Sequence, residues 1–242
     1  MTKDIDEAKQ AARERVWALL EREGAVRVGV HGHIPNFAGA DRAAQRLAEL
    51  EAWRAAEVVK SNPDKAQLPV RVRALNEGKL LYMAVPRLAT PKPFYLLDAA
   101  ALTVAFETAA TSGGGAAGAA RTIGVDEMSP VDLIVCGSVA VNRQGVRVGK
   151  GAGYADIEVA LLAEAGLIRS ATVIATTVHQ IQVVEENLPE TKHDFSVDLI
   201  VTPDDVIRCG PSRRPSGIVL DQLSSEKAAE IPVLAALVHK AG

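Results

Sequence analysis

The feature that most limits the fold is a set of short, almost wholly apolar stretches separated by helical patterns. Four of them lie at residues 79–88, 131–141, 171–178 and 195–202. Strands that are covered on both faces have this composition. Apolar strands that alternate with helices favour a parallel sheet with helices on both sides. The sequence therefore predicts the α/β class, as a three-layer α/β/α fold with a mostly parallel central sheet.

Helical patterns occur where this alternation requires them. Apolar residues recur at helical spacing over residues 5–23, and Gly24 follows as a stop. Further helices are predicted over residues 40–53 and 68–78 and from Tyr154 onward. A shorter strand over residues 55–60 is predicted to end at the turn formed by residues 62–64.

Length and charge restrict the class of protein. A chain of 242 residues with 48% hydrophobic residues can form one large domain, expected over residues 1–242 with a C-terminal tail from about 205 to 242. The net charge of −3 comes without a basic block, so no nucleic-acid partner is expected. No apolar run reaches the roughly 20 residues of a membrane span, and the charged start favours a cytoplasmic protein. The oligomeric state is left open.

Two minor features are predicted to be structural. Cys136 and Cys209 lie far apart and outside any C-x-x-C spacing, so both are expected to be buried and reduced. The segment AATSGGGAAGAA, residues 109–120, is rich in glycine and alanine. We interpret it as a flexible connection in preference to a phosphate-binding nest.

A glycine loop is the strongest candidate for a functional site. In RVGKGAGYADIEVALL, residues 147–162, glycines stand at 149, 151 and 153 between a predicted strand and a predicted helix. Glycines let backbone N–H groups approach an anion, and the helix adds its positive dipole end. The loop fits neither the G-x-G-x-x-G fingerprint nor the P-loop. Phosphate binding is favoured, and a plain strand-to-helix turn is the alternative.

Several blocks resemble one enzyme family. The loop GVRVGKGAGYAD is similar to the G-x-R-x-G-x-G-x-G-Y-Y-D loop of the 5-formyltetrahydrofolate cyclo-ligase family. Lys9 and Arg13 match its K-x-x-x-R pair, and EVVKSNPD, LYMAVPRL and LPETKHDFSVDLIVTP resemble further blocks in the same order. HIPNFAGA, CGSVAVN and GYADIE resemble the methenyltetrahydrofolate synthase domain-containing branch of that family.

The resemblance implies an activity and a set of site residues. The activity is ATP- and Mg²⁺-dependent closure of 5-formyltetrahydrofolate to 5,10-methenyltetrahydrofolate, with release of ADP and phosphate. Positioning and charge stabilisation dominate such a phosphoryl transfer, so cations are expected to converge on the phosphates. The implied residues are Lys150 and Arg147 for catalysis; Lys9, Arg13, Gly149, Lys150, Gly151, Ala152, Gly153 and Tyr154 for ATP; Glu57 and Tyr154 for substrate; and Asp156 and Asp194 for the metal.

Departures from the family pattern leave alternatives open. Ala155 replaces the second tyrosine of G-Y-Y-D, and CGSVAVN lacks the proline and the aromatic residue that usually precede the loop. Aromatic faces commonly grip flat heterocycles, and Phe94, Tyr95 or Phe37 could compensate. One alternative is an ATP-binding relative that acts on a different small heterocycle. Another is a nucleotide-binding or interaction module without turnover.

Overall fold

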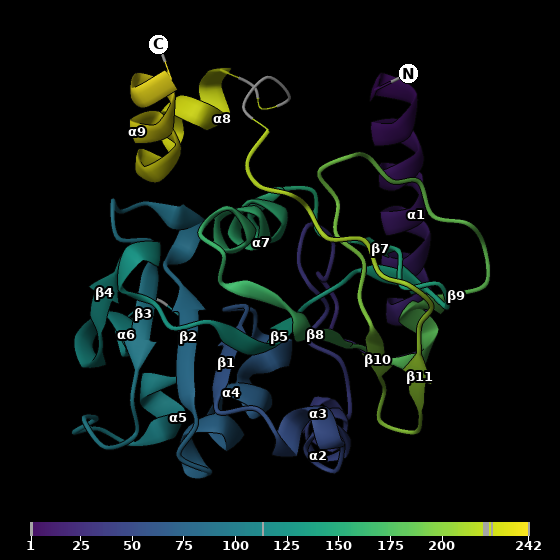
Figure 1. Ribbon diagram of the computed structural model, residues 1–242. Helices are drawn as coiled ribbons and strands as arrows, with labels where there is room; N and C mark the ends of the chain where they lie inside the picture. Colours follow the sequence, from purple (N-terminus) through teal and green to yellow (C-terminus); the bar gives the residue numbers. More distant parts are fainter. Residues whose placement is uncertain (1, 113, 220–222, 224, 242) are drawn as a thin grey trace.

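An eight-stranded sheet runs through the centre of the molecule in the computed structural model, which describes residues 2–112, 114–219, 223 and 225–241 (Figure 1). Its strand order is β11-β10-β8-β5-β1-β2-β3-β4. The middle strands, from β10 to β2, are parallel, and the edge strands β11, β3 and β4 are antiparallel. The strands are β1 (Val58–Ser61), β2 (Leu80–Ala84), β3 (Phe94–Leu97), β4 (Arg121–Ile123), β5 (Val131–Cys136), β8 (Ile168–Thr177), β10 (Leu199–Val201) and β11 (Val206–Arg208).

Helices cover both faces of this sheet (Figure 1). Along β5, Leu133 and Val135 pack with the helices of one face, while Ile134 and Cys136 pack with those of the other. All four side chains are fully buried, which explains the unbroken apolar run. The prediction of a three-layer α/β/α fold is confirmed. One layer holds α7 (Tyr154–Glu164), α8 (Ser225–Glu230) and α9 (Pro232–Ala241); the other holds α2 (Ala40–Ala48), α3 (Glu51–Arg54), α4 (Leu68–Asn76), α5 (Phe106–Ala109) and α6 (Gly114–Ala119).

A small second sheet and the N-terminal helix complete the molecule beside the main sheet (Figure 1). The sheet contains β7 (Arg147–Val148), β6 (Ala140–Asn142) and β9 (Val183–Val184), in that order. Helix α1 (Thr2–Arg22) packs Ala12 and Val16 against Ala140 and Val148. This packing brings the first helix next to the glycine loop that follows β7. Short 3₁₀ helices lie at η1 (Lys65–Gln67), η2 (Pro86–Leu88), η3 (Val125–Glu127) and η4 (Gln180–Gln182).

Several predicted elements differ in extent from those observed. The helix expected over 40–53 is divided into α2 and α3, and the strand expected over 79–88 ends at Ala84. The strand expected over 131–141 stops at Cys136, and its last residues belong to β6 in the small sheet. The strand expected over 195–202 shortens to β10. The apolar residues on either side of the observed strands, such as Val139 after β5 and Phe195 and Val197 before β10, are buried outside the main sheet.

Two structural predictions are wrong in part. The segment 109–120 is not simply a flexible connection: apart from Gly113, which lies outside the described residues, it contains the end of α5 and all of α6, with Ala116 fully buried. Both cysteines are free, but only Cys136 is buried, since Cys209 on the edge of the sheet is partly exposed.

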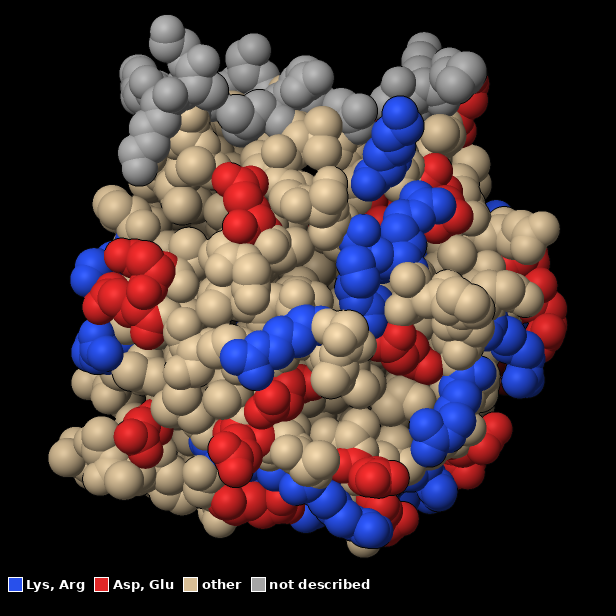
Figure 2. Space-filling model, viewed as in Figure 1, with Lys and Arg blue, Asp and Glu red and all other residues tan. Residues whose placement is uncertain are grey.

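Charges of both signs share the molecular surface. On the face shown in Figure 2, basic and acidic side chains lie interspersed, with runs of basic side chains next to acidic ones. Within the part of the chain that the structure describes, no helix combines the length and apolar character needed to cross a membrane.

Candidate functional site

The candidate site lies at the point where the strand order reverses. The chain runs outward from β1 through β2 to the edge, and it then returns to β5 on the other side of β1. In open parallel sheets, ligands bind beyond the carboxyl ends of the strands at such a switch point. Residues 62–64 follow β1 there, and Gly137 and Ser138 follow β5.

The glycine loop joins β7 to α7 at this edge. Gly151 has a φ of 103° and Gly153 a φ of 71°, values that side chains disfavour, so glycine is required at both positions. Gly153 is the N-cap of α7, and half-buried Ala152 lies between the two glycines. The first-turn amides of an 11-residue helix therefore begin directly after the loop, which is the arrangement that favours an anion.

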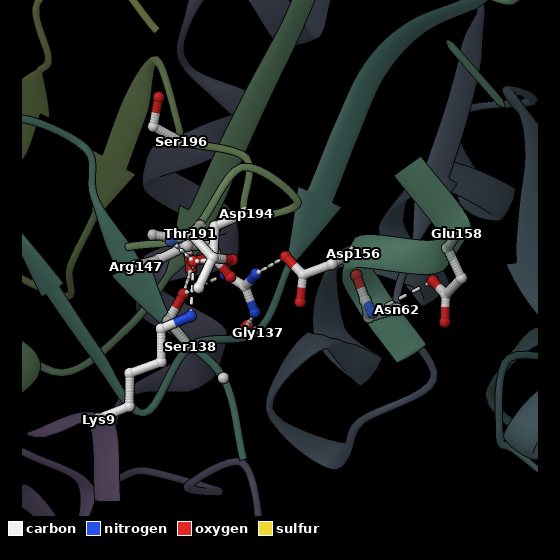
Figure 3. Close-up of polar contacts among 12 residues, drawn as sticks. Lys9, Asn62, Gly137, Ser138, Arg147, Asp156, Glu158, Thr191, Asp194 and Ser196 are labelled. Carbon is white, nitrogen blue, oxygen red and sulfur yellow. Dashed lines mark hydrogen bonds and ion pairs between the residues drawn. The ribbon is translucent and has the colours of Figure 1, made fainter. Parts of the chain in front are cut away.

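Arg147 is the buried cation of the site. Its Nη1 donates to Asp156 Oδ1 at 3.1 Å, its Nη2 to the Gly137 carbonyl at 3.3 Å, and its Nε to Ser138 Oγ at 3.4 Å (Figure 3). The guanidinium also lies 4.6 Å from the centre of the Phe195 ring. Burial opposes its charge, but the surrounding carboxylates, Asp156 first, raise the pKa of Arg147 above its usual value. Burial raises the pKa of Asp156, although Arg147 opposes that shift. The guanidinium is thus held in one orientation.

Helix α1 supplies two more cations to the same place. Lys9 Nζ donates to Asp194 Oδ2 at 2.5 Å, and Arg13 Nε donates to the carbonyl of Gly149 at 2.7 Å. Burial would raise the pKa of Asp194, but the hydrogen bonds from Lys9 and Thr191 lower it below its usual value. The structure therefore brings together groups that are more than 130 residues apart in the sequence, and Figure 3 shows Lys9 reaching Asp194 and Arg147 reaching Asp156.

Lys150 points to the loop after β1. Its Nζ lies 3.1 Å from Asp64 Oδ1, with the lysine more exposed than the aspartate. Arg71, fully buried under that loop, donates to the carbonyls of Asn62 and Asp64 and so fixes the backbone there. Burial lowers the pKa of Arg71 to about 10. Asp64 was not among the predicted site residues, although it follows a buried strand closely, and this position is a signal in the sequence.

The helix that follows the glycine loop takes part in a second buried ion pair. Lys60 of β1 and Glu158 of α7 form a salt bridge, and Asn62 Nδ2 donates to the same Glu158 oxygen at 3.3 Å. Both charged side chains are almost completely buried. Burial raises the pKa of Glu158, while Lys60 opposes the shift. This pair joins the central strand to the helix that carries Asp156.

Not every predicted residue reaches the site. Glu57 is exposed and precedes β1, so it lies at the amino ends of the parallel strands, opposite the glycine loop. Its own amide donates to Asp132 Oδ2 at 3.0 Å. Tyr154 begins α7, and Lys227 Nζ lies 3.6 Å from the centre of its ring. The placement of Glu57 gives no support to a shared role with the loop.

The aromatic residues considered as replacements lie elsewhere. Phe94 and Tyr95 belong to β3 near the sheet edge, where both are buried in the core. Phe37 packs edge-on against the ring of His179 at 6.3 Å, next to the end of β8. Phe94 pairs with Ala84 at the carboxyl end of β2, but its ring is fully buried.

The acidic residues fit a magnesium ion that also binds a polyphosphate. Among the described residues, no group of three or more His, Cys, Asp or Glu side chains is arranged to hold a metal by itself. Mg²⁺ usually takes one or two carboxylates and completes its shell with phosphate oxygens and water. Together with burial, the charge of Asp194 raises the pKa of Asp156, so the two carboxylates belong to the same site. They offer the hard oxygen donors that this cation prefers.

These features define an α/β protein with a glycine loop and a cluster of paired charges at the switch point of its sheet. The chain matches the model of the 5-formyltetrahydrofolate cyclo-ligase family over residues 5–203, and it belongs to this family.

Relatives and a solved structure agree with this assignment. Methenyltetrahydrofolate synthase domain-containing proteins of Bos taurus and Mus musculus are 36% and 38% identical to it over 96% and 94% of this chain. The chain spans 62% of the length of each of these relatives. The NMR structure of Aquifex aeolicus 5,10-methenyltetrahydrofolate synthetase aligns with a TM-score of 0.54 and 23% identity, covering 85% of this chain and 94% of that one. At this identity the likeness shows a shared fold.

Proposed function

We propose that the chain is an ATP- and Mg²⁺-dependent cyclo-ligase that converts 5-formyltetrahydrofolate to 5,10-methenyltetrahydrofolate, releasing ADP and phosphate. The observation that carries the proposal is the convergence of Lys9, Arg13 and Arg147 on the glycine loop, next to Asp156 and Asp194. Family membership gives the reaction type. A small-molecule substrate, with a reduced folate as the first candidate, is part of the same proposal.

Each cation has a role that follows from its position. Arg147 is fixed by four groups, so it offers preorganised positive charge to a phosphoryl group that gains negative charge. Lys150 is partly exposed and pairs with Asp64 at the surface, so it can turn toward a phosphate entering the loop. Lys9 and Arg13 approach from α1 on the other side. Asp156 and Asp194 would hold the metal, whose charge offsets that of the phosphates.

The direct test is a spectrophotometric assay for 5,10-methenyltetrahydrofolate with the purified chain, 5-formyltetrahydrofolate, ATP and MgCl₂. We expect product to form only when ATP and Mg²⁺ are both present. A chain that binds ATP but forms no product from this folate would contradict the proposed reaction.

The substrate side supports a second candidate, in which the same chemistry acts on another N-formyl or amidic heterocycle. Ala155 stands where the family loop has a second tyrosine, and Glu57 lies at the far edge of the sheet. A panel of N-formyl heterocycles, with ATP consumption as the readout, separates the two candidates.

Replacing Asp156 by asparagine tests the metal role. The asparagine keeps the shape of the side chain but removes the charge that would face Mg²⁺. Affinity for ATP measured with Mg²⁺ should fall about tenfold, while affinity measured with EDTA should change little or improve. Because Arg147 loses its carboxylate partner, the melting temperature should fall as well, so titration calorimetry must be run well below it.

Asp204→Asn is the matched control, because Asp204 pairs with Arg42 at 3.3 Å on an exposed surface. It should leave both affinities unchanged. Equal magnesium dependence in the wild type and in Asp156→Asn would remove Asp156 from the metal site.

A further inference from the structure

The segment that follows β11 crosses the loop that carries Asp194. Ser196 N donates to the Arg213 carbonyl at 3.1 Å, and Arg213 N donates to Ser196 Oγ at 2.5 Å. We call residues 212–214 the arginine strap. It lies about 15 residues beyond the loop in the sequence and was assigned no role by sequence motifs.

The side chain of Arg213 also forms hydrogen bonds with this loop. Nη1 donates to the Thr191 carbonyl at 2.7 Å, and Nη2 donates to Glu190 Oε1 at 2.8 Å. Thr191 in turn donates to Asp194 Oδ2 through its amide at 2.5 Å and through its hydroxyl at 3.0 Å. Arg213 therefore holds the carbonyl of the residue whose amide and hydroxyl bind the carboxylate, and Figure 3 shows Thr191 directly beside Asp194.

The rest of the strap is fixed to the central sheet. Arg214 and Ser212 each bond to a carboxylate oxygen of Asp198. The same Asp198 accepts a hydrogen bond from Ile174 N of β8 at 2.7 Å. Arg214 Nη1 also donates to the Ser196 carbonyl at 3.1 Å. Because Asp198 links the strap to β8, the strap can hold the loop in a fixed position relative to the central sheet.

The ion pair between Arg213 and Glu190 adds little to the stability of the fold. The side chain of Arg213 is 42% exposed and that of Glu190 is 32% exposed, so solvent screens their ion pair. Lys9 comes from the other end of the chain and donates to the same Asp194 oxygen as Thr191. Asp194 is thus held directly by Lys9 of α1 and, through Thr191, by the strap.

We propose that Arg213 is a positioning residue for Asp194: it holds Thr191 by its carbonyl, so that the Thr191 amide and hydroxyl keep the carboxylate facing the magnesium-bound nucleotide together with Lys9. The inference rests on the proposed function in that Asp194 acts toward the metal. Residues that orient a metal ligand typically change metal affinity by about tenfold or more when they are replaced.

The test compares Arg213→Gln, Arg213→Lys and Arg208→Gln with the wild type by titration calorimetry, using ATP with MgCl₂ and ATP with EDTA. Arg208 is the matched control. It is exposed on β11, and its side chain forms no hydrogen bond or ion pair with any described residue. Arg213→Gln should weaken binding of magnesium-bound ATP about tenfold and leave binding in EDTA within about twofold. Arg213→Lys should lie between, because one amine can bond to the Thr191 carbonyl but cannot form the fork.

The outcomes are distinct. Equal magnesium-dependent affinity in Arg213→Gln and the wild type overturns the inference, as does an equal loss with and without Mg²⁺, which would indicate a structural role only. Should Arg213→Gln fail to fold, the same comparison is made with Arg213→Lys. A wild type that binds magnesium-bound ATP but forms no methenyl product contradicts the proposed function and leaves the binding comparison valid. A wild type that binds no ATP overturns both.

Discussion

Replacing Arg147 by glutamine should lower kcat/KM by about a thousandfold and destabilise the fold by about 3 kcal/mol. The guanidinium is 2% exposed and lies between Asp156, Ser138 and the Phe195 ring. A glutamine cannot reach these groups together, and it leaves the Asp156 carboxylate without its cation. Activity is measured with the methenyltetrahydrofolate assay, and stability by urea unfolding.

Arg143→Gln provides the matched control for this variant. Arg143 follows β6 in the same hairpin and pairs with Glu185 at 3.0 Å, with both side chains more than half exposed. An exposed pair of this kind contributes at most about 1 kcal/mol, and it lies outside the site. Loss of activity in Arg143→Gln similar to that in Arg147→Gln would show that the hairpin, not the buried cation, matters.

The layered architecture could be predicted because burial on both faces leaves a strong signal in composition. β5 and β8 read as apolar runs since each is covered by a helical layer above and below. The antiparallel strands β3 and β4 gave no such signal. They are short, lie at the sheet edge, and are joined by a segment of small residues whose helix α6 depends on tertiary packing.

The candidate site was predictable where the residues belong to a recognisable motif. Arg147, Lys150 and Asp156 lie within the glycine loop and its helix, and the K-x-x-x-R spacing identified Lys9 and Arg13. Their convergence could not be derived from spacing alone. It depends on α1 packing against the small sheet, a contact between distant parts of the chain.

The substrate-binding role expected for Glu57 stays a prediction, and the position of Glu57 before β1 bears on it. All parallel strands in one sheet present their carboxyl ends at the same edge, so a residue before β1 lies at the edge opposite the loops that follow β1 and β5. Asp64 satisfies this rule and is found next to Lys150. The direction of the predicted strand is therefore enough to favour Asp64 over Glu57 as a neighbour of the glycine loop.

The ion pair between Lys60 and Glu158 also left a signal in the sequence. Lys60 ends the apolar stretch AAEVVK, and Glu158 interrupts the apolar run of α7. A charge in a buried element is costly unless a partner of opposite sign lies nearby. Two such charges of opposite sign, one in a central strand and one in the helix that covers it, therefore indicate that they form an ion pair.

This pair leads to the second large expected effect. Glu158→Gln should lower the free energy of unfolding by about 3 to 5 kcal/mol, because it leaves the Lys60 ammonium buried without a counter-charge. The double variant Lys60→Met, Glu158→Leu removes both charges and should recover about half of that loss or more. Full recovery is not expected, since Asn62 loses the oxygen to which its buried amide donates.

Urea unfolding of the single and double variants decides how the pair acts, with Arg73→Gln as the control. Arg73 pairs with Glu77 at 3.4 Å on the exposed face of α4, and its loss should change stability by no more than about 0.5 kcal/mol. If Glu158→Gln lowered the free energy of unfolding no more than this control, water or another group would have to replace Glu158 beside Lys60. The pair would then add little to the stability of the contact between β1 and α7. If the double variant were as unstable as Glu158→Gln, the loss would come from packing and not from an uncompensated charge. Stability that returns only when both charges are removed indicates that the two charges neutralise each other, and that this pair joins β1 to the helix that carries Asp156.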